Sequence, residues 1–97
     1  MGERDDVLAA LRAALPELQR GWPIRSLAVF GSVAREEAGA ASDLDILVEF
    51  DDSIILSDFL ALEERLSAIT GRSVELVSRR ALKPFIGSHI LREAVLV

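Results

Sequence analysis

The stretch IRSLAVFGSVAREEAGAASDLDILVEF, residues 24–50, decides how the rest of the chain is interpreted. Alternation around its two aspartates predicts a strand over residues 43–50, with Asp43 and Asp45 on one face and apolar side chains on the other. Carboxylates about 7 Å apart on one face of a strand repel each other. Magnesium is usually held by one or two carboxylates together with substrate phosphates, so this pair predicts a magnesium site.

A glycine and a serine separate the earlier part of this stretch into a strand and a helix. Residues 26–30 predict a short strand that stops at Gly31 and Ser32, and residues 33–38 predict a short helix. Glycine permits close approach of the backbone, and serine can cap a helix or bond a phosphate oxygen. Unpaired amides at such a turn carry partial positive charge suited to an anion. The stretch therefore predicts a phosphate site beside a metal site.

Composition bounds the classes of function that the chain can have. It has 97 residues, a net charge of −5 and 51% hydrophobic residues, which predicts one domain over residues 1–97 without a separate recognition domain. The acidity argues against direct nucleic-acid binding by bulk electrostatics. The absence of cysteine excludes disulfides and thiolate zinc sites. Because no apolar run approaches the roughly 18 residues of a bilayer span, we expect no membrane contact and a cytoplasmic location.

The residues before the central stretch predict a packing helix. Asp5 or Asp6 can cap it, and Pro16 is expected to interrupt it or to start a new turn. Trp22 stands in the break that follows the helix. A single aromatic residue is weak evidence for base stacking, so Trp22 is expected to cover the core.

The residues after the central stretch predict a helix and a third strand. The helix spans residues 57–70, ends at Gly71 and presents the charged residues 63–65 on its polar side. Residues 73–78 alternate as a strand with Glu75 in the middle. Glu75 is either a surface residue of an edge strand or, beside an Asp-x-Asp strand, a third carboxylate.

The last part of the chain carries a basic cluster and two short elements. Arg79, Arg80 and Lys83 either contact a triphosphate or an acidic partner, or form a plain exposed turn. Pro84 fits the first turn of a final helix, and residues 94–97 predict a short closing strand.

The spacing of Gly31-Ser32, ten residues, then Asp43-x-Asp45 resembles the signature of minimal nucleotidyltransferases of the DNA polymerase β superfamily. The local sequences FGSVAR and SDLDILVEF strengthen the resemblance, and VELV falls where the family carries its third acid. The resemblance covers nearly the whole chain. It implies an α/β (α+β) fold like the polymerase β palm, with a short mixed sheet and helices packed mainly on one face.

The same resemblance implies roles for the site residues. ATP would be the substrate, and two Mg²⁺ ions would span its triphosphate. Asp43 and Asp45 would bind the metals. Glu75 would also bind metal or would polarise the acceptor hydroxyl as a general base. Gly31 and Ser32 would hold the β and γ phosphates.

Three positions leave alternatives open within that picture. Arg35 either adds a charge-assisted contact to phosphate or is a surface residue. Glu36 stands where members often have glycine, so either the phosphate loop is less open or this side chain points to solvent. Glu75 replaces the more usual aspartate and moves the carboxylate outward by one methylene. A shift of that order near reacting atoms can cost on the order of 100-fold in rate.

Small members of this family are commonly encoded beside a HEPN-domain protein, a helical ribonuclease toxin. They act as its antitoxin by transferring AMP to a toxin hydroxyl, typically that of tyrosine. The resemblance thus implies a Mg-ATP-dependent protein adenylyltransferase with a HEPN toxin as its partner. The alternative is a non-catalytic nucleotide-binding antitoxin that neutralises its partner by direct binding, which Glu36 and Glu75 favour. Transfer to a small molecule ranks last, because such relatives carry extra domains.

Overall fold

The computed structural model of the chain describes residues 2–37 and 43–97. The loop predicted over residues 39–42, and the end of the helix predicted over residues 33–38, lie outside the described residues. Helices and strands otherwise alternate along the chain, close to the predicted positions. The elements are α1 (Glu3–Gly21), β1 (Ile24–Phe30), α2 (Gly31–Ala34), β2 (Leu44–Phe50), α3 (Leu56–Thr70), β3 (Val74–Ser78), η1 (Arg79–Ala81), α4 (Pro84–Glu93) and β4 (Val95–Leu96).

The four strands form one mixed sheet in the order β3-β2-β1-β4. Strand β1 pairs antiparallel with both β2 and β4, whereas β2 pairs parallel with β3. A parallel pair needs a crossover connection, and α3 supplies it between β2 and β3. The mixed α/β fold with a short mixed sheet, predicted from the resemblance, is confirmed.

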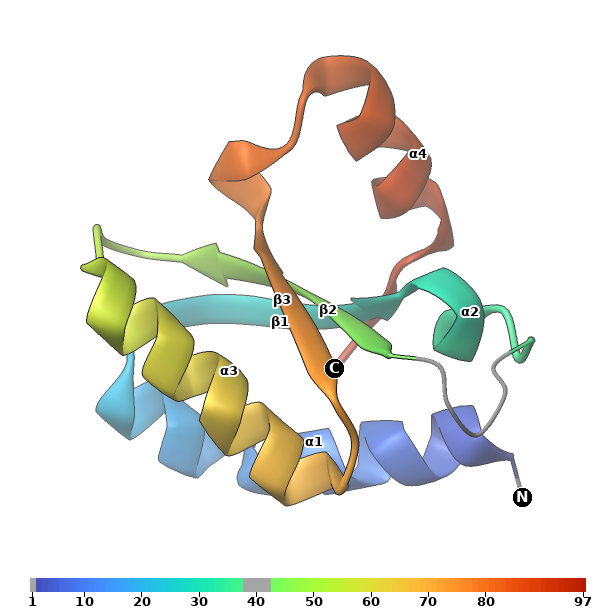
Figure 1. Cartoon of the computed structure of the whole chain (residues 1–97), viewed down its shortest axis with the longest axis horizontal. Coiled ribbons are helices and arrows are strands. Elements are labelled where there is room, and N and C mark those ends of the chain that lie inside the picture. Colours follow the sequence, from blue (N-terminus) through green and yellow to red (C-terminus); the bar gives the residue numbers. More distant parts are fainter. Residues whose placement is uncertain (1, 38–42) are drawn as a thin grey trace.

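Helices α1 and α3 lie side by side on one face of the sheet (Figure 1). Their apolar stripes and the inward-facing strand residues form the main core. Burying a leucine side chain fully contributes roughly 1.5–3 kcal/mol, so this layer holds the sheet in place. Trp22 packs against the same core, as predicted, and its Nε1 donates to the Asp58 carbonyl at 2.9 Å. Fully buried members include Leu11, Leu18, Leu27, Leu44, Ile46, Leu62 and Leu66.

Helix α4 lies on the opposite face and covers only part of it (Figure 1). A small apolar cluster under it comprises Ala28, Phe30 and Leu47, with Ile90 and Ala94 packed against them. Within α4 itself, all of which the structure describes, Gly87 alone is buried. The helices are therefore packed mainly on one face, and polar residues at both ends of the other face remain accessible.

The first helix differs from the prediction at its start and at its proline. It begins at Glu3, so that Asp5 and Asp6 lie in its first turn, where negative charge favours the helix dipole, and neither is the cap. Pro16 lies inside α1 and does not interrupt it. That prediction was wrong because fully buried leucines on both sides of the proline offset its cost of about 3 kcal/mol. Within residues 2–37 and 43–97, no helix is long and apolar enough to cross a membrane.

The outer edge of β3 is covered by side chains of α3. The amide of Val74 donates to Ser67 Oγ at 3.2 Å, and the amide of Leu76 donates to Glu63 Oε2 at 2.9 Å. The prediction that Glu63 lies on the polar side of the helix is therefore wrong. The open amides of an edge strand attract its carboxylate. These bonds hold β3 against α3, while the parallel ladder holds β3, and with it Glu75, beside β2.

Candidate active site

Three acidic side chains lie at one end of the partly open face of the sheet. Asp43 immediately precedes β2, and Asp45 is the second residue of that strand. The parallel pairing places Asp45 opposite Glu75 of β3, and neighbouring strands are about 4.8 Å apart. Asp43 and Glu75 are exposed, and Asp45 is half-buried. The structure thus brings together the three carboxylates that the sequence selected.

The surroundings of Asp45 raise its pKa above the ordinary value of an aspartate. Burial is the largest cause, and the negative charges of Glu75 and Asp43 add to it. A hydrogen bond with the Glu75 carboxyl group raises the pKa further, whereas the charge of Arg35 lowers it. The folded protein therefore disfavours ionised Asp45, and a cation placed between these acids would reverse that preference.

The donor set fits magnesium that arrives with a phosphate ligand. In the part of the chain that the structure describes, no three acidic or histidine side chains converge as a ready-made metal site. Magnesium seldom uses an all-protein cage and keeps water and substrate phosphates among its ligands. Asp43 and Asp45, with Glu75 beside them, could supply the oxygen donors and the negative charge of such an open site.

Gly31 brings the turn after β1 directly against Asp45. Strand β1 ends at Phe30, which pairs with Asp45 across the antiparallel ladder. Gly31 follows with φ of 74°, in the left-handed region that favours glycine. A Cβ at this position would collide with Asp45 Oδ2 and lie 3.1 Å from Asp45 Cγ. Because Gly31 and the half-buried Ser32 share this turn, the predicted phosphate residues lie next to the predicted metal residues.

The turn opens α2 as predicted, although the described helix ends at Ala34. Glu36, just beyond it, has φ of 61°, a left-handed conformation that is rare for a residue with a Cβ. A glycine would adopt this conformation without that cost. The Glu36 side chain is exposed and forms an ion pair with Arg4 of α1 at 3.5 Å.

Arg35 lies beside the Gly31 turn, but an acid already binds it. Its guanidinium donates to both carboxylate oxygens of Glu93, at 2.9 and 3.2 Å, and to Glu37 at 3.1 Å. The Gly31 amide donates to Glu93 Oε1 at 3.2 Å. Bonds from Arg35 and Gly31 hold the pKa of Glu93 below its usual range. Sequence reasoning missed Glu93, because it stands 62 positions from Gly31 and belongs to no motif.

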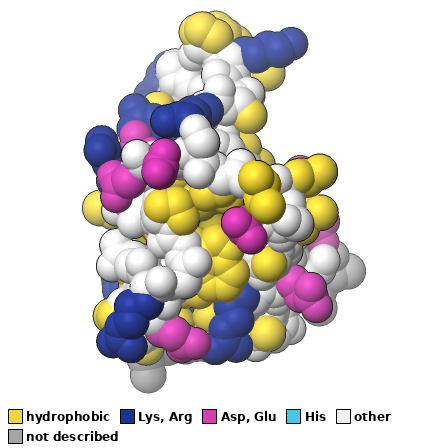
Figure 2. Space-filling view, turned by 90° about the vertical axis from the view of Figure 1, so that its left-hand side faces the viewer, with side chains coloured by type: hydrophobic (Ala, Val, Ile, Leu, Met, Phe, Trp, Pro, Cys, Tyr) yellow, Lys and Arg dark blue, Asp and Glu magenta, His cyan; other side chains and the backbone are white. Residues whose placement is uncertain are grey.

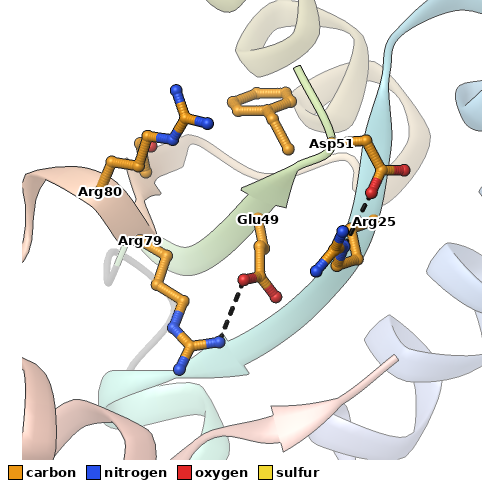
Figure 3. A pocket seen from close by; sticks show the side chains of 7 residues that line it. Arg25, Glu49, Asp51, Arg79 and Arg80 are labelled. Carbon is orange, nitrogen blue, oxygen red and sulfur yellow. Dashed lines mark hydrogen bonds and ion pairs between the residues drawn. The ribbon is translucent and has the colours of Figure 1, made fainter. Parts of the chain in front are cut away.

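The predicted basic cluster lies away from the three carboxylates. Arg79 and Arg80 line a cavity of about 330 Å³ at the far end of β2 (Figure 3). Arg79 contacts Glu49, which is four residues along β2 from Asp45, or about 13 Å at the rise of a strand. This placement does not favour contact of Arg79 with a triphosphate held at Asp45.

Two ion pairs cross this far cavity, as Figure 3 shows. Arg79 Nη1 lies 3.2 Å from Glu49 Oε2, and Arg25 Nε lies 2.7 Å from Asp51 Oδ1. Glu49 and Asp51 are therefore each paired with an arginine. Figure 2, which faces this end of the molecule, shows apolar side chains in the middle and charged side chains around them.

A palm-like mixed sheet with clustered carboxylates beside a Gly-Ser turn defines a class of phosphate-transferring enzymes. The family model described as "Nucleotidyltransferase domain" matches residues 11–97, which include every residue of the candidate site. This chain belongs to the nucleotidyltransferase family.

Individual relatives are similar over nearly the whole chain. Protein adenylyltransferase MntA of Thermococcus cleftensis is 41% identical over 93 residues, which cover 96% of this chain and 94% of that protein. A solved structure described as a minimal nucleotidyltransferase is 38% identical, with a TM-score of 0.82, over 100% of this chain and 97% of the other. A complex described as a tri-AMPylated Shewanella oneidensis HEPN toxin with an MNT antitoxin shares the fold alone. It is 18% identical, with a TM-score of 0.60, over 97% of this chain and 67% of that chain.

Proposed function

We propose that this nucleotidyltransferase transfers AMP from Mg-ATP to a hydroxyl, that of a tyrosine, on a HEPN-domain toxin in the cytoplasm, and so acts as an antitoxin. The observation that carries the proposal is the position of Asp45, which lies opposite Glu75, against the Gly31 turn and within the electrostatic influence of Asp43. The name of the relative MntA and the AMPylated toxin seen with a protein of the same fold support the acceptor class.

Each residue of the site has a role in this reaction. Asp43 and Asp45 would hold magnesium, which neutralises charge on the triphosphate and on the leaving pyrophosphate. The turn at Gly31 and Ser32 would hold the β and γ phosphates. Glu75 would accept the proton of the acceptor hydroxyl, a role supported by its exposure and its position opposite Asp45. The acceptor oxygen then bonds to the α phosphorus as the bond to pyrophosphate breaks, and the proton passes to Glu75.

Labelled substrate tests this proposal directly. ATP carrying label in its α phosphate is incubated with magnesium, the protein and its cognate HEPN-domain partner. We expect label on the partner with the natural protein and none with the double variant Asp43→Ala, Asp45→Ala. The matched control is Glu49→Ala, Asp51→Ala, which removes the same number of acids at the other end of β2 and should leave labelling intact. Label that persisted in the first double variant would remove the assignment to this site.

A non-catalytic antitoxin that binds nucleotide is the second candidate. The observations that favour it are the glutamate at position 75, where the family more usually has aspartate, and the left-handed Glu36 in the phosphate loop. Co-expression with the toxin separates the two candidates. Full neutralisation by the Asp43→Ala, Asp45→Ala variant would show that contact is sufficient, whereas renewed toxicity would show that transfer is required.

A further inference from the structure

We infer that Glu93 competes with the phosphates of the nucleotide for the same donors. Its carboxylate must leave Gly31 and Arg35 before a phosphate can bind there. The inference rests on the proposed function, because that function places the β and γ phosphates at the Gly31 turn. It adds a residue that no sequence motif includes, and it makes the end of α4 part of the nucleotide site.

The groups that bind Glu93 are the groups that bind phosphate in proteins. One backbone amide and one guanidinium converge on its carboxylate: Gly31 N at 3.2 Å and Arg35 Nη1 at 2.9 and 3.2 Å. Arg35 contacts both oxygens through the single nitrogen Nη1, and charge-assisted hydrogen bonds from arginine are made to carboxylate and phosphate alike. The Glu93 carboxylate therefore stands where a phosphate edge fits the same donors.

Glu93 and a phosphate cannot share these donors. The Gly31 amide has a single hydrogen, which already points at Glu93 Oε1. A phosphate at the same place would also meet a carboxylate of like charge, and like charges in contact oppose binding. Asp45 also lies against Gly31, so without a bound cation a phosphate at this turn would face two acids. Nucleotide binding therefore requires that Glu93 move.

The surroundings of Glu93 allow it to move. It is the last residue of α4, and the two-residue strand β4 follows after Ala94. The Glu93 side chain is 28% exposed and that of Arg35 is 46% exposed, so solvent can take over from the ion pair. Arg35 also keeps Glu37 as a second partner at 3.1 Å. Rotation of one side chain frees the amide and half of the guanidinium without unfolding an element.

The test compares two glutamates that contact the same arginine. Glu93→Gln removes the charge that occupies Gly31, whereas Glu37→Gln removes a charge that contacts Arg35 only. The dissociation constant of a non-hydrolysable ATP analogue with magnesium, and of inorganic triphosphate, is measured by calorimetry for both variants. We expect Glu93→Gln to bind roughly tenfold tighter, which corresponds to about 1.4 kcal/mol, and Glu37→Gln to stay within about twofold. The KM for ATP should fall in Glu93→Gln, with kcat changed less.

Weaker or unchanged binding by Glu93→Gln would overturn the inference, since Glu93 would then position Arg35 for phosphate rather than compete with it. Should Glu93→Gln not fold, Glu93→Asp withdraws the carboxylate from Gly31 but keeps its charge, and it should also tighten binding. If Glu93→Gln binds the ATP analogue more tightly but no AMP is transferred to the HEPN protein, the proposed function is removed and the competition is kept. If AMP is transferred but Glu93→Gln leaves binding unaltered, the competition is removed and the proposed function is kept. No binding by any form of the protein would remove both.

Discussion

The two ends of β2 carry acids on the same face of the sheet, but only one end neutralises them. At the far end, Glu49 and Asp51 each form an ion pair with an arginine. At the near end, no ion pair within residues 2–37 and 43–97 reaches Asp43, Asp45 or Glu75. Exposed ion pairs contribute about 0–1 kcal/mol to stability, so the acids at the far end are neutralised without adding much to the stability of the fold. The near end holds Asp45, whose pKa is raised by burial and by the charges of Glu75 and Asp43, and a carboxyl group perturbed in this way is typical of a functional site.

Removing one acid from each end of β2 should give the largest difference in AMP transfer. Asp45→Ala should reduce AMP transfer by at least about 100-fold, the lower range for losing one preorganised electrostatic contact at a reacting centre. Glu49→Ala, four positions along the same strand, should change the initial rate by less than about twofold, because its carboxylate only pairs with an exposed arginine. Initial rates at saturating Mg-ATP measure both. Equal losses in the two variants would contradict a functional difference between the ends.

The near end also differs in how closely the backbone approaches its acid. Gly31→Ala should lower the free energy of unfolding by more than the roughly 1–2 kcal/mol of a left-handed alanine, because its Cβ would also collide with Asp45. Gly71→Ala is the matched control, since Gly71 has φ of 69° and nothing within 4 Å of an added Cβ. It should show the backbone cost alone and keep full activity. Urea unfolding and transfer rates are measured together. A Gly71→Ala variant as damaged as Gly31→Ala would refute the collision.

How much of this site the sequence could predict depends on the range of the interactions. Alternation placed Asp43 and Asp45 on one face and Glu75 on a third strand, because the period of a strand is local. The parallel register that sets Asp45 opposite Glu75 rests on the α3 crossover. The bonds of Glu93 to Gly31 and Arg35 arise only when α4 folds back onto the sheet, so no local spacing signals them.

The repulsion at the near end predicts a gain in stability when a charge is removed. The pKa of Asp45 is raised in the folded state, so ionised Asp45 destabilises the metal-free fold, and this loss grows as the pH rises through that pKa. Asp45→Asn should therefore raise Tm at neutral pH by a few degrees, where roughly 1 kcal/mol corresponds to about 4–8 °C for a domain of this size. The gain should shrink at acidic pH. Asp51→Asn, which loses an ion pair with Arg25, should not raise Tm. Thermal melts without magnesium measure both, and a lower Tm for Asp45→Asn would contradict the repulsion.

The smallest expected effect concerns Glu36, whose unusual feature is its left-handed backbone conformation rather than its charge. A left-handed glutamate costs roughly 1–2 kcal/mol, whereas glycine adopts this conformation freely but loses about 0.5–1 kcal/mol through chain entropy. Its ion pair with Arg4 has a 56% exposed acid and contributes little. Glu36→Gly should therefore stabilise the protein by up to about 1 kcal/mol, measured by urea unfolding. Glu36→Gln, which removes the charge and keeps the Cβ, should stay near the natural protein. A stabilised glutamine variant would show that the charge of Glu36, and not its backbone strain, is what lowers the stability of the folded protein.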